Sequence, residues 1–137
     1  MTDLFGNNLA DLQDFLAFFG VAVILTIIFV GVYSTVTRHN EIKLIKEKST
    51  AAAIAFSGSL IGFAMPLASA MMNSVTILEM VVWGVIALIV QIVVYLLVRL
   101  PMPRISERIT ANEVAAGIWL GATSLVGGIL NAASMTT

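Results

Sequence analysis

Four long uncharged runs dominate this 137-residue chain, at residues 15–37, 49–78, 80–98 and 114–137. A helix needs about 20 predominantly apolar residues to cross a bilayer, so each run is long enough for one crossing. Only 11% of the residues are charged, whereas a soluble domain has about 25%. The runs are continuously apolar rather than alternating, which favours helices over membrane strands. We therefore predict an all-α integral membrane protein, with four transmembrane helices forming a single membrane domain over residues 1–137.

The basic residues predict how the chain is threaded through the membrane. All seven Lys and Arg residues lie in two short segments, 38–48 and 99–108, and the other connections and the two ends carry none. Positive charge marks the inner side of a membrane protein, so both termini are expected outside. The helices are expected at about 15–37, 50–72, 77–99 and 113–134. Thr110 and Glu113 have the spacing of a capping box in front of the last helix.

The two halves of the chain resemble each other. Shifting residues 39–72 by 63 positions onto 102–135 aligns Ala52 with Ala115, Gly58 with Gly121, and Leu67 with Leu130. The pattern predicts two helical hairpins, at about 15–72 and 77–135, that arose by duplication. Each hairpin crosses the membrane twice, so both copies face the same way, as in parallel-repeat membrane proteins.

Small residues form a stripe along the second and fourth predicted helices. The glycines of these stripes are Gly58, Gly62, Gly117, Gly121 and Gly128. Two of the pairs have the GxxxG spacing that lets helix backbones approach closely in membranes. We expect these glycines to pack the two helices together. The alternative is that the stripes line a path, with the neighbouring hydroxyl side chains as its polar groups.

Two further residues stand out within the predicted spans. Gln91 is the one strongly polar side chain near the centre of a span, and an interhelical hydrogen bond is its expected role. Polar residues at that depth also mark substrate paths, so Gln91 is the leading candidate for a functional residue in the core. Pro66 removes a helical hydrogen bond, which indicates either a fixed kink or a hinge with a freed carbonyl.

Two acidic residues, Asp14 and Glu79, precede the first and third apolar runs. We expect both at helix N-termini, where a negative charge interacts favourably with the helix dipole. The alternative interpretation is an acidic outer mouth that attracts cations.

Residue types needed for catalysis are sparse. The chain has no cysteine, and the predicted spans hold no ionisable group at bilayer depth, where proton-coupled transporters need one. No nucleotide-binding loop, metal-ligand cluster or nucleophile–base pair is recognisable. We expect no cofactor and no nucleic-acid partner, with the lipid bilayer as the main surroundings, and an enzyme is the least favoured reading.

Several short motifs nevertheless resemble a known family. They are His39-Asn40-Glu41, Leu44-Ile45, Thr50-Ala51-Ala52, Ala55-Phe56-Ser57-Gly58, Gly62, Pro66-Leu67, Ile89-Val90-Gln91, Arg99-Leu100, Met102-Pro103, Ser106-Glu107, Ala115-Ala116-Gly117, Gly127-Gly128-Ile129 and Asn131-Ala132-Ala133. In order and spacing they are similar to the YjfL-type family of uncharacterised bacterial inner-membrane proteins (domain of unknown function 350). The resemblance implies paired two-helix repeats in the inner membrane, with both termini periplasmic. It also implies a role in envelope maintenance beside envelope-stress proteins and a peptide-ligase-like protein, and it assigns no functional residue.

Two functions remain open from the sequence. The first is a non-enzymatic scaffold or accessory protein that acts through a homo-oligomer or a partner, which the small-residue stripes and the uncharged spans favour. The second is a small oligomeric channel or passive transporter, which the repeat, Pro66, Gln91 and the acidic residues favour. A single four-helix chain has little room for a lumen, so the channel hypothesis requires several copies.

Overall fold

The computed structural model describes residues 2–37 and 41–135, and within these ranges the regular secondary structure is entirely helical. Its helices are α1 (Thr2–Thr37), α2 (Glu41–Lys46), α3 (Thr50–Asn73), α4 (Ile77–Arg99), α5 (Ile105–Thr110) and α6 (Val114–Met135). Four of them, α1, α3, α4 and α6, are long and apolar enough to cross a membrane. The predicted class, an all-α protein with four membrane-spanning helices, is confirmed. Residues 38–40, part of the first basic segment, lie outside the described ranges.

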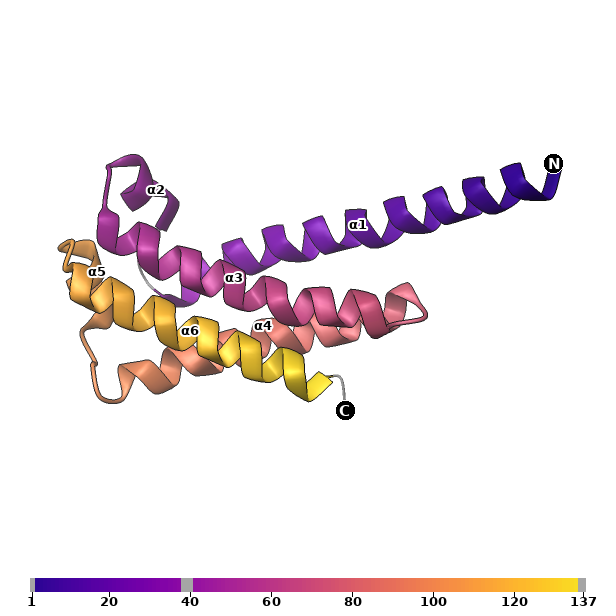
Figure 1. The fold of residues 1–137 in the computed structure, drawn as a ribbon. Helices are drawn as coiled ribbons and strands as arrows, with labels where there is room; N and C mark the ends of the chain where they lie inside the picture. The colour runs from indigo at the N-terminus through magenta and orange to yellow at the C-terminus, as the bar shows by residue number, and fades with distance from the viewer. Residues whose placement is uncertain (1, 38–40, 136–137) are drawn as a thin grey trace.

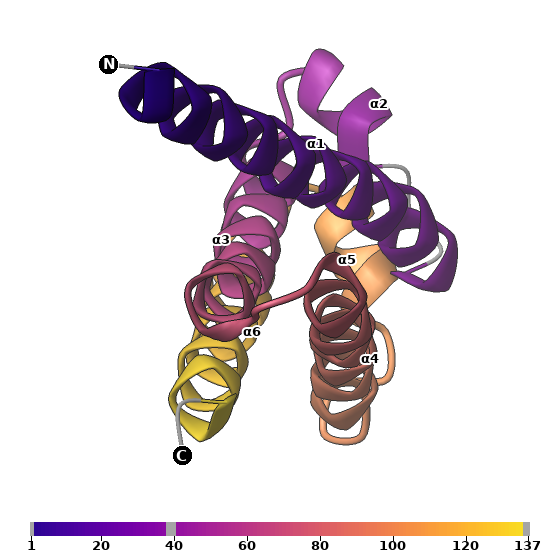
Figure 2. The same cartoon turned by 90° about the vertical axis from the view of Figure 1, so that its right-hand side faces the viewer.

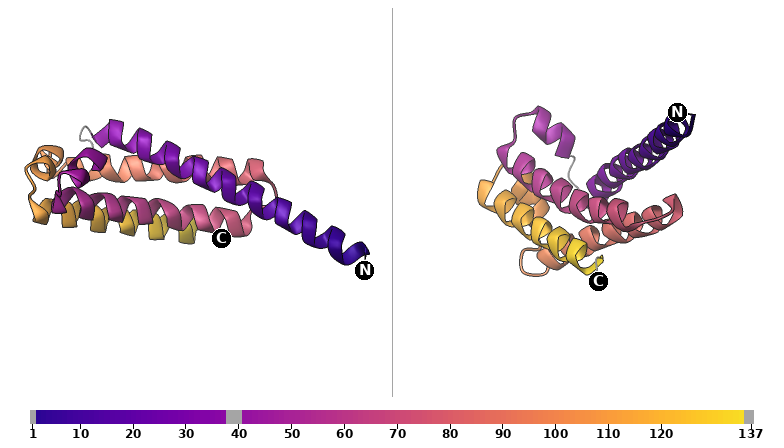
Figure 3. Two further views of the ribbon diagram at one scale, coloured as in Figure 1. Left: turned by 90° about the horizontal axis from the view of Figure 1, so that it is seen from above. Right: turned by 45° about the vertical axis from the view of Figure 1, so that its right-hand side comes forward.

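The first helix is much longer than expected. It begins at Thr2 rather than near residue 15, and Gly6, Asn7 and Asn8 do not interrupt it. At 1.5 Å per residue, its 36 residues extend about 54 Å, against a bilayer core of about 30 Å. The N-terminal half of α1 accordingly projects away from the other helices (Figures 1 and 3). Within its span, apolar side chains such as Phe15, Phe19 and Ile24 are exposed.

The centre of the molecule is the pair α3 and α6, which lie side by side and run in the same direction (Figures 1 and 2). Helix α4 packs against both members of this pair, and α1 crosses over α4 and α3. The α1–α3 contact includes the rings of Phe29 and Phe63, which stack with centroids 4.4 Å apart. Because α1 contacts α4 and α3 whereas α4 contacts both α3 and α6, the four spans are not arranged symmetrically in one chain.

The short helices α2 and α5 lie at the same end of the bundle (Figure 1). This end, which we call the basic end, carries the basic residues of the described ranges: Lys43, Lys46, Lys48, Arg99, Arg104 and Arg108. All of them lie between α1 and α3 or between α4 and α6, or at the end of α4. The two basic segments of the sequence are therefore at the same end of the folded chain.

Helices α2 and α5 each end in a turn of the same type. The N–H of Ser49 donates to Leu44 O at 2.9 Å and that of Lys48 to Ile45 O at 2.9 Å; Glu113 and Asn112 make the corresponding bonds to Arg108 O (3.0 Å) and Ile109 O (2.9 Å). This is the Schellman pattern, which places the residue after the helix in the left-handed region. Lys48 has φ of 66° and Asn112 has φ of 62°.

The capping box predicted at Thr110 and Glu113 is not formed. Thr110 is the last residue of α5, and its hydroxyl donates to Ser106 O at 2.9 Å. The Glu113 carboxylate pairs instead with Arg108, at 2.9 Å. A capping box needs its first residue outside the helix, and the extra turn of helix α5 places Thr110 inside one.

Asn112 caps a different helix. Its Oδ1 accepts a hydrogen bond from the Ala51 N–H at 3.0 Å and lies 3.4 Å from the Ser49 hydroxyl. Ser49 is itself the N-cap of α3 and accepts from Ala52 N–H at 3.3 Å. The first N–H groups of a helix have no partner within it. The turn before α6 therefore helps to hold the start of α3.

Candidate functional site where the four spans meet

Gln91 lies on α4 and is completely buried. Its Nε2 donates to Ser124 O on α6 at 3.1 Å, and the same atom lies against Gly62 of α3. Its Oε1 is buried without a hydrogen-bond partner. The residue is thus tied to a neighbouring helix by one end of its amide and unsatisfied at the other, which is uncommon for a buried polar atom.

A line of hydroxyl groups continues from this point. Ser59 Oγ of α3 lies 3.2 Å from Ser124 Oγ of α6, 2.8 Å from Tyr33 Oη of α1, and 3.0 Å from Ala55 O. Ser59, Ser124 and Tyr33 are all buried. A hydroxyl has one proton and can accept from others, so the three groups can satisfy one another. Together with Gln91 they form what we call the central polar cluster, to which each of the four spans contributes one side chain.

A second polar contact lies nearer the basic end. Tyr95 Oη of α4 donates to Thr37 O, the last carbonyl of α1, at 3.1 Å, and it also hydrogen-bonds Ser106 Oγ of α5. Ser106 Oγ also lies within hydrogen-bond distance of Thr37 O, so the hydroxyl protons of Tyr95 and Ser106 are shared among these three contacts. The rings of Tyr95 and Tyr33 meet edge to face with centroids 6.0 Å apart. These contacts join the end of α1 to α4 and α5.

The glycines singled out in the sequence lie between α3 and α6. A Cβ built on Gly58 would stand 2.5 Å from Gly121 Cα, and one on Gly121 would stand 2.7 Å from Ile54 O. A Cβ on Gly117 would be 2.8 Å from Ala51 Cα. Real Cβ atoms do not approach backbone this closely. The two helices are therefore in backbone contact, with no space between them for a side chain at these positions.

Pro66 lies inside α3 and is fully buried. Because proline has no N–H, the carbonyl four residues earlier, that of Gly62, loses its usual helical partner. That carbonyl faces α6 at Gly128, where an added Cβ would overlap Gly62 O and stand 2.5 Å from Gly62 C. The freed carbonyl is therefore covered by the backbone of the neighbouring helix.

Glu79 and Asp14 do not occupy equivalent places. Glu79 is in the first turn of α4: its carboxylate accepts from Val75 N–H at 3.0 Å, and its own N–H donates to the Thr76 hydroxyl at 3.2 Å. Asp14 is exposed and lies several turns inside α1, because that helix begins at Thr2. The expectation that Asp14 marks a helix start is wrong. Because α1 begins at Thr2, the positive end of its helix dipole lies more than ten residues before Asp14.

The central polar cluster can donate and accept hydrogen bonds but carries no formal charge. Its members are an amide, two serine hydroxyls and a tyrosine hydroxyl, none of which is a base at neutral pH. Across the described residues, no group of three or more His, Asp or Glu side chains is placed to hold a metal ion.

Sequence reasoning missed three important residues. Tyr33 and Tyr95 are the two tyrosines of the chain, and each lies within two turns of the basic end of an apolar helix, where a polar tip usually finds a partner. That placement was the available signal. Asn112 had one too, since asparagine tolerates the left-handed conformation between two helical segments. Its use as a cap for α3 depends on a contact between distant parts of the chain.

Comparisons with known proteins agree with a membrane location. The chain is 48% identical over 128 residues to the UPF0719 inner membrane protein YjfL of Escherichia coli strain K12, covering 93% of this chain and 97% of that protein. It is 26% identical over 119 residues to the UPF0719 transmembrane protein YshE of Bacillus subtilis, covering 85% and 87%. No solved structure matches it significantly. Residues 7–135 match the model of the family described as Domain of Unknown Function (DUF350). The chain is therefore a multi-pass inner-membrane protein that belongs to the DUF350 family.

Proposed function

We propose that this protein is a non-enzymatic scaffold or accessory protein of the inner membrane that acts as a homo-oligomer in envelope maintenance. The observation that carries the proposal is the contact between Gly58 and Gly121, where the backbones of α3 and α6 meet. A pore within one chain needs a lumen between its helices, and the backbone contact of α3 with α6 leaves none between these two central helices. We therefore infer that the helix bundle acts as a scaffold rather than as a channel.

The central polar cluster supports a non-enzymatic role. Its hydroxyls are engaged with one another and with backbone carbonyls, and the cluster contains no group that would act as a base toward Ser59 or Ser124. A serine nucleophile requires such a base within hydrogen-bond distance. Buried polar contacts of this kind instead fix which helix faces meet.

The threading and the duplication are parts of the same proposal. We place both termini on the periplasmic side and the basic end in the cytoplasm, because inner loops collect Lys and Arg. We also infer two repeats, at about 15–72 and 77–135. The matching Schellman turns support this: Lys48 and Asn112, both at positive φ, are 64 residues apart (112 minus 48), and so are the starts of α3 and α6 (114 minus 50). This offset is one residue more than the shift of 63 that aligns the two sequences.

The asymmetry of the single chain supports an oligomer. Helix α4 packs on both α3 and α6, whereas its counterpart α1 packs on α4 and α3 and projects outward at its N-terminal half. Within the apolar span of α1, side chains such as Phe15, Phe19 and Ile24 are exposed and make little contact within the chain. A second copy would provide the packing surface that α1 lacks. We also propose envelope-stress proteins as further partners, on the resemblance to the family alone.

A second candidate, an oligomeric channel or passive transporter, rests on Gln91. Its Oε1 is buried without a partner, and unsatisfied polar atoms at bilayer depth are costly. Along a path, this atom would contact a passing solute or water. Because α3 and α6 leave no room between themselves and Gln91 is fully buried within the chain, this candidate requires an oligomer in which α4 separates from that pair so that Gln91 reaches the path.

Flux through reconstituted liposomes separates the two functions. We expect liposomes containing the wild-type protein to retain small ions and solutes, and we expect cross-linking in native membranes to give one discrete oligomer. Gln91→Leu, and Asp14→Asn combined with Glu79→Gln, should alter assembly or stability only. Thr123→Val is a matched control, because the Thr123 hydroxyl bonds only to carbonyls of its own helix.

The opposite result would favour the channel. Reproducible flux that Gln91→Leu abolishes and Thr123→Val preserves, with folding intact, would overturn the scaffold proposal. A protein that remains monomeric in native membranes would remove the oligomer from it.

A further inference from the structure

A cavity of about 370 Å³ opens at the basic end, beside the end of α4. It is lined by Arg99, Pro103, Arg104, Ser106, Glu107 and Thr110. The lining therefore combines two guanidinium groups with one carboxylate. A cavity with this surplus of positive charge favours an anion.

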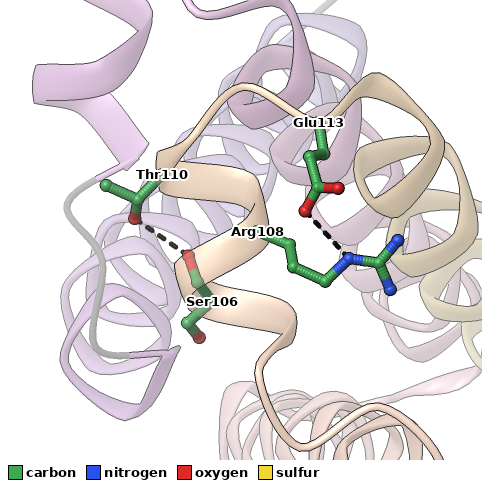
Figure 4. Close-up of polar contacts among 4 residues, drawn as sticks. All are labelled: Ser106, Arg108, Thr110 and Glu113. Atoms are coloured by element: carbon green, nitrogen blue, oxygen red, sulfur yellow. Dashed lines mark hydrogen bonds and ion pairs between the residues drawn. The ribbon is translucent and has the colours of Figure 1, made fainter.

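The cations of this region are not equivalent. Arg108 extends to one side of α5 and pairs with Glu113 at 2.9 Å, whereas Ser106 and Thr110 lie on its other side (Figure 4). No ion pair joins Arg99 or Arg104 to another described residue; Arg99 lies 6.0 Å from the ring of Tyr95 instead. The basic groups of the cavity are thus the uncompensated ones.

The hydroxyls of the lining have already used their protons. Ser106 Oγ donates to Thr37 O, and Thr110 Oγ1 donates to Ser106 O at 2.9 Å. The donors left for a ligand are the guanidinium groups of Arg99 and Arg104. Arginine matches the oxygens of a phosphate group, with two N–H groups facing two oxygens.

The position of the cavity indicates where the phosphate comes from. Arg99 is the last residue of α4, so it lies where that apolar span leaves the bilayer. Leu96 and Leu97, in the turn before it, are exposed, and so is Leu100 directly after it. A ligand seated on Arg99 would therefore have a lipid-facing apolar surface directly beside it.

We propose that this cavity binds the phosphodiester headgroup of an anionic phospholipid, with Arg99 and Arg104 as the phosphate ligands and the acyl chains along the exposed face of α4. Clustered basic residues at the cytoplasmic ends of spans bind anionic lipids, each contributing near the surface. The Glu107 carboxylate repels the phosphate and so limits how strongly the site prefers an anionic lipid over a zwitterionic one. The bound lipid also contacts α5, whose Ser106 is tied to the end of α1, so occupancy stabilises the junction of three helices.

The test is native mass spectrometry of the detergent-purified full chain, titrated with phosphatidylglycerol and with phosphatidylcholine of the same acyl chains. We expect the wild type to retain phosphatidylglycerol in preference. The preference should fall roughly fivefold for Arg99→Gln and by a similar factor for Arg104→Gln. It should rise for Glu107→Gln. The matched control, Lys46→Gln with Lys48→Asn, removes two charges from the other basic segment and should leave the preference unchanged.

Each other outcome counts against the proposal. An unchanged preference in Arg99→Gln/Arg104→Gln, or an equal loss in the lysine control, means that lipid is held by diffuse charge and not by this cavity. The last measurement adds inorganic phosphate as a competitor of the lipid. If it displaces phosphatidylglycerol and raises the melting temperature of the wild type as much as the lipid does, the site takes a soluble phosphate and the lipid assignment is wrong. Melting curves in phosphatidylcholine alone verify that the variants fold.

Discussion

Gly128 of α6 lies directly against the carbonyl of Gly62 in α3, so closely that a side chain at Gly128 would overlap Gly62 O. The carbonyl is free because Pro66, four residues later, has no N–H to donate to it. In lipid an unpartnered carbonyl is costly. The close approach of the Gly128 Cα provides a weak C–H···O contact and also excludes lipid from it. The proline and the glycine are therefore two parts of one feature.

The glycine contacts predict large losses of stability. Gly58→Leu or Gly121→Leu places a side chain where the neighbouring backbone already lies, and backbone cannot move aside as a flexible side chain does. Overpacking of this kind costs about 1–3 kcal/mol or more, so we expect the melting temperature in detergent to fall clearly. Gly31→Leu is the control, because nothing lies within 4 Å of a Cβ built there. Equal melting temperatures for all three variants would mean that the contact is absent.

The turn at Asn112 predicts two separable effects. Asn112→Ala loses both the cap on Ala51 N–H and the residue best suited to positive φ, so it should cost about 1–2 kcal/mol. Asn112→Gly loses only the cap and should cost less. Lys48→Gly, at the equivalent turn, should be neutral or stabilising because glycine adopts positive φ without strain. Chemical denaturation in detergent measures all three, and an unaltered midpoint for Asn112→Ala would contradict the capping role.

The tyrosine contacts predict that the hydroxyls of Tyr33 and Tyr95 both stabilise the packing of α1, and that their contributions are coupled. Tyr33→Phe removes the hydroxyl bonded to Ser59, and Tyr95→Phe removes the donor to Thr37 O. Each should cost about 1 kcal/mol, and because the two rings are in contact, the effects should not add. A double-mutant cycle in melting experiments measures the coupling. Strict additivity would show that the two hydroxyls act independently.

The proposed threading predicts which residues react from each side of the membrane. The chain has no cysteine of its own, so single cysteines report unambiguously. Val75, 85% exposed between α3 and α4, should be labelled in intact spheroplasts by an impermeant maleimide after Val75→Cys. Lys46→Cys should be labelled only after the membrane is opened. The reverse pattern would invert the topology.

The sequence was sufficient for the number of spans and for both boundaries of three of the four spanning helices. Apolar length decides whether a segment crosses a bilayer, and this is a local property, so α3, α4 and α6 begin and end within a residue or so of expectation. It was insufficient for the start of α1, because the uncharged run begins only at residue 15 whereas the helix begins at Thr2. A helix that leaves the bilayer can continue in water if its own backbone bonds are maintained, and local polarity does not decide that.

The sequence by itself therefore determined the all-helical class, the four spans and the collection of basic charge at one end, because these depend on the transfer of each segment from water to lipid. The tertiary structure decided which polar groups meet. It placed Gln91 against Ser124, Asn112 against the start of α3, and Thr110 inside α5 rather than in front of α6. It also left α1 on one side of α4 instead of in a symmetrical position. The physical reason is that lipid is as apolar as the helices, so hydrophobicity does not choose between helix faces, and close packing and hydrogen bonds formed between distant parts of the chain make that choice.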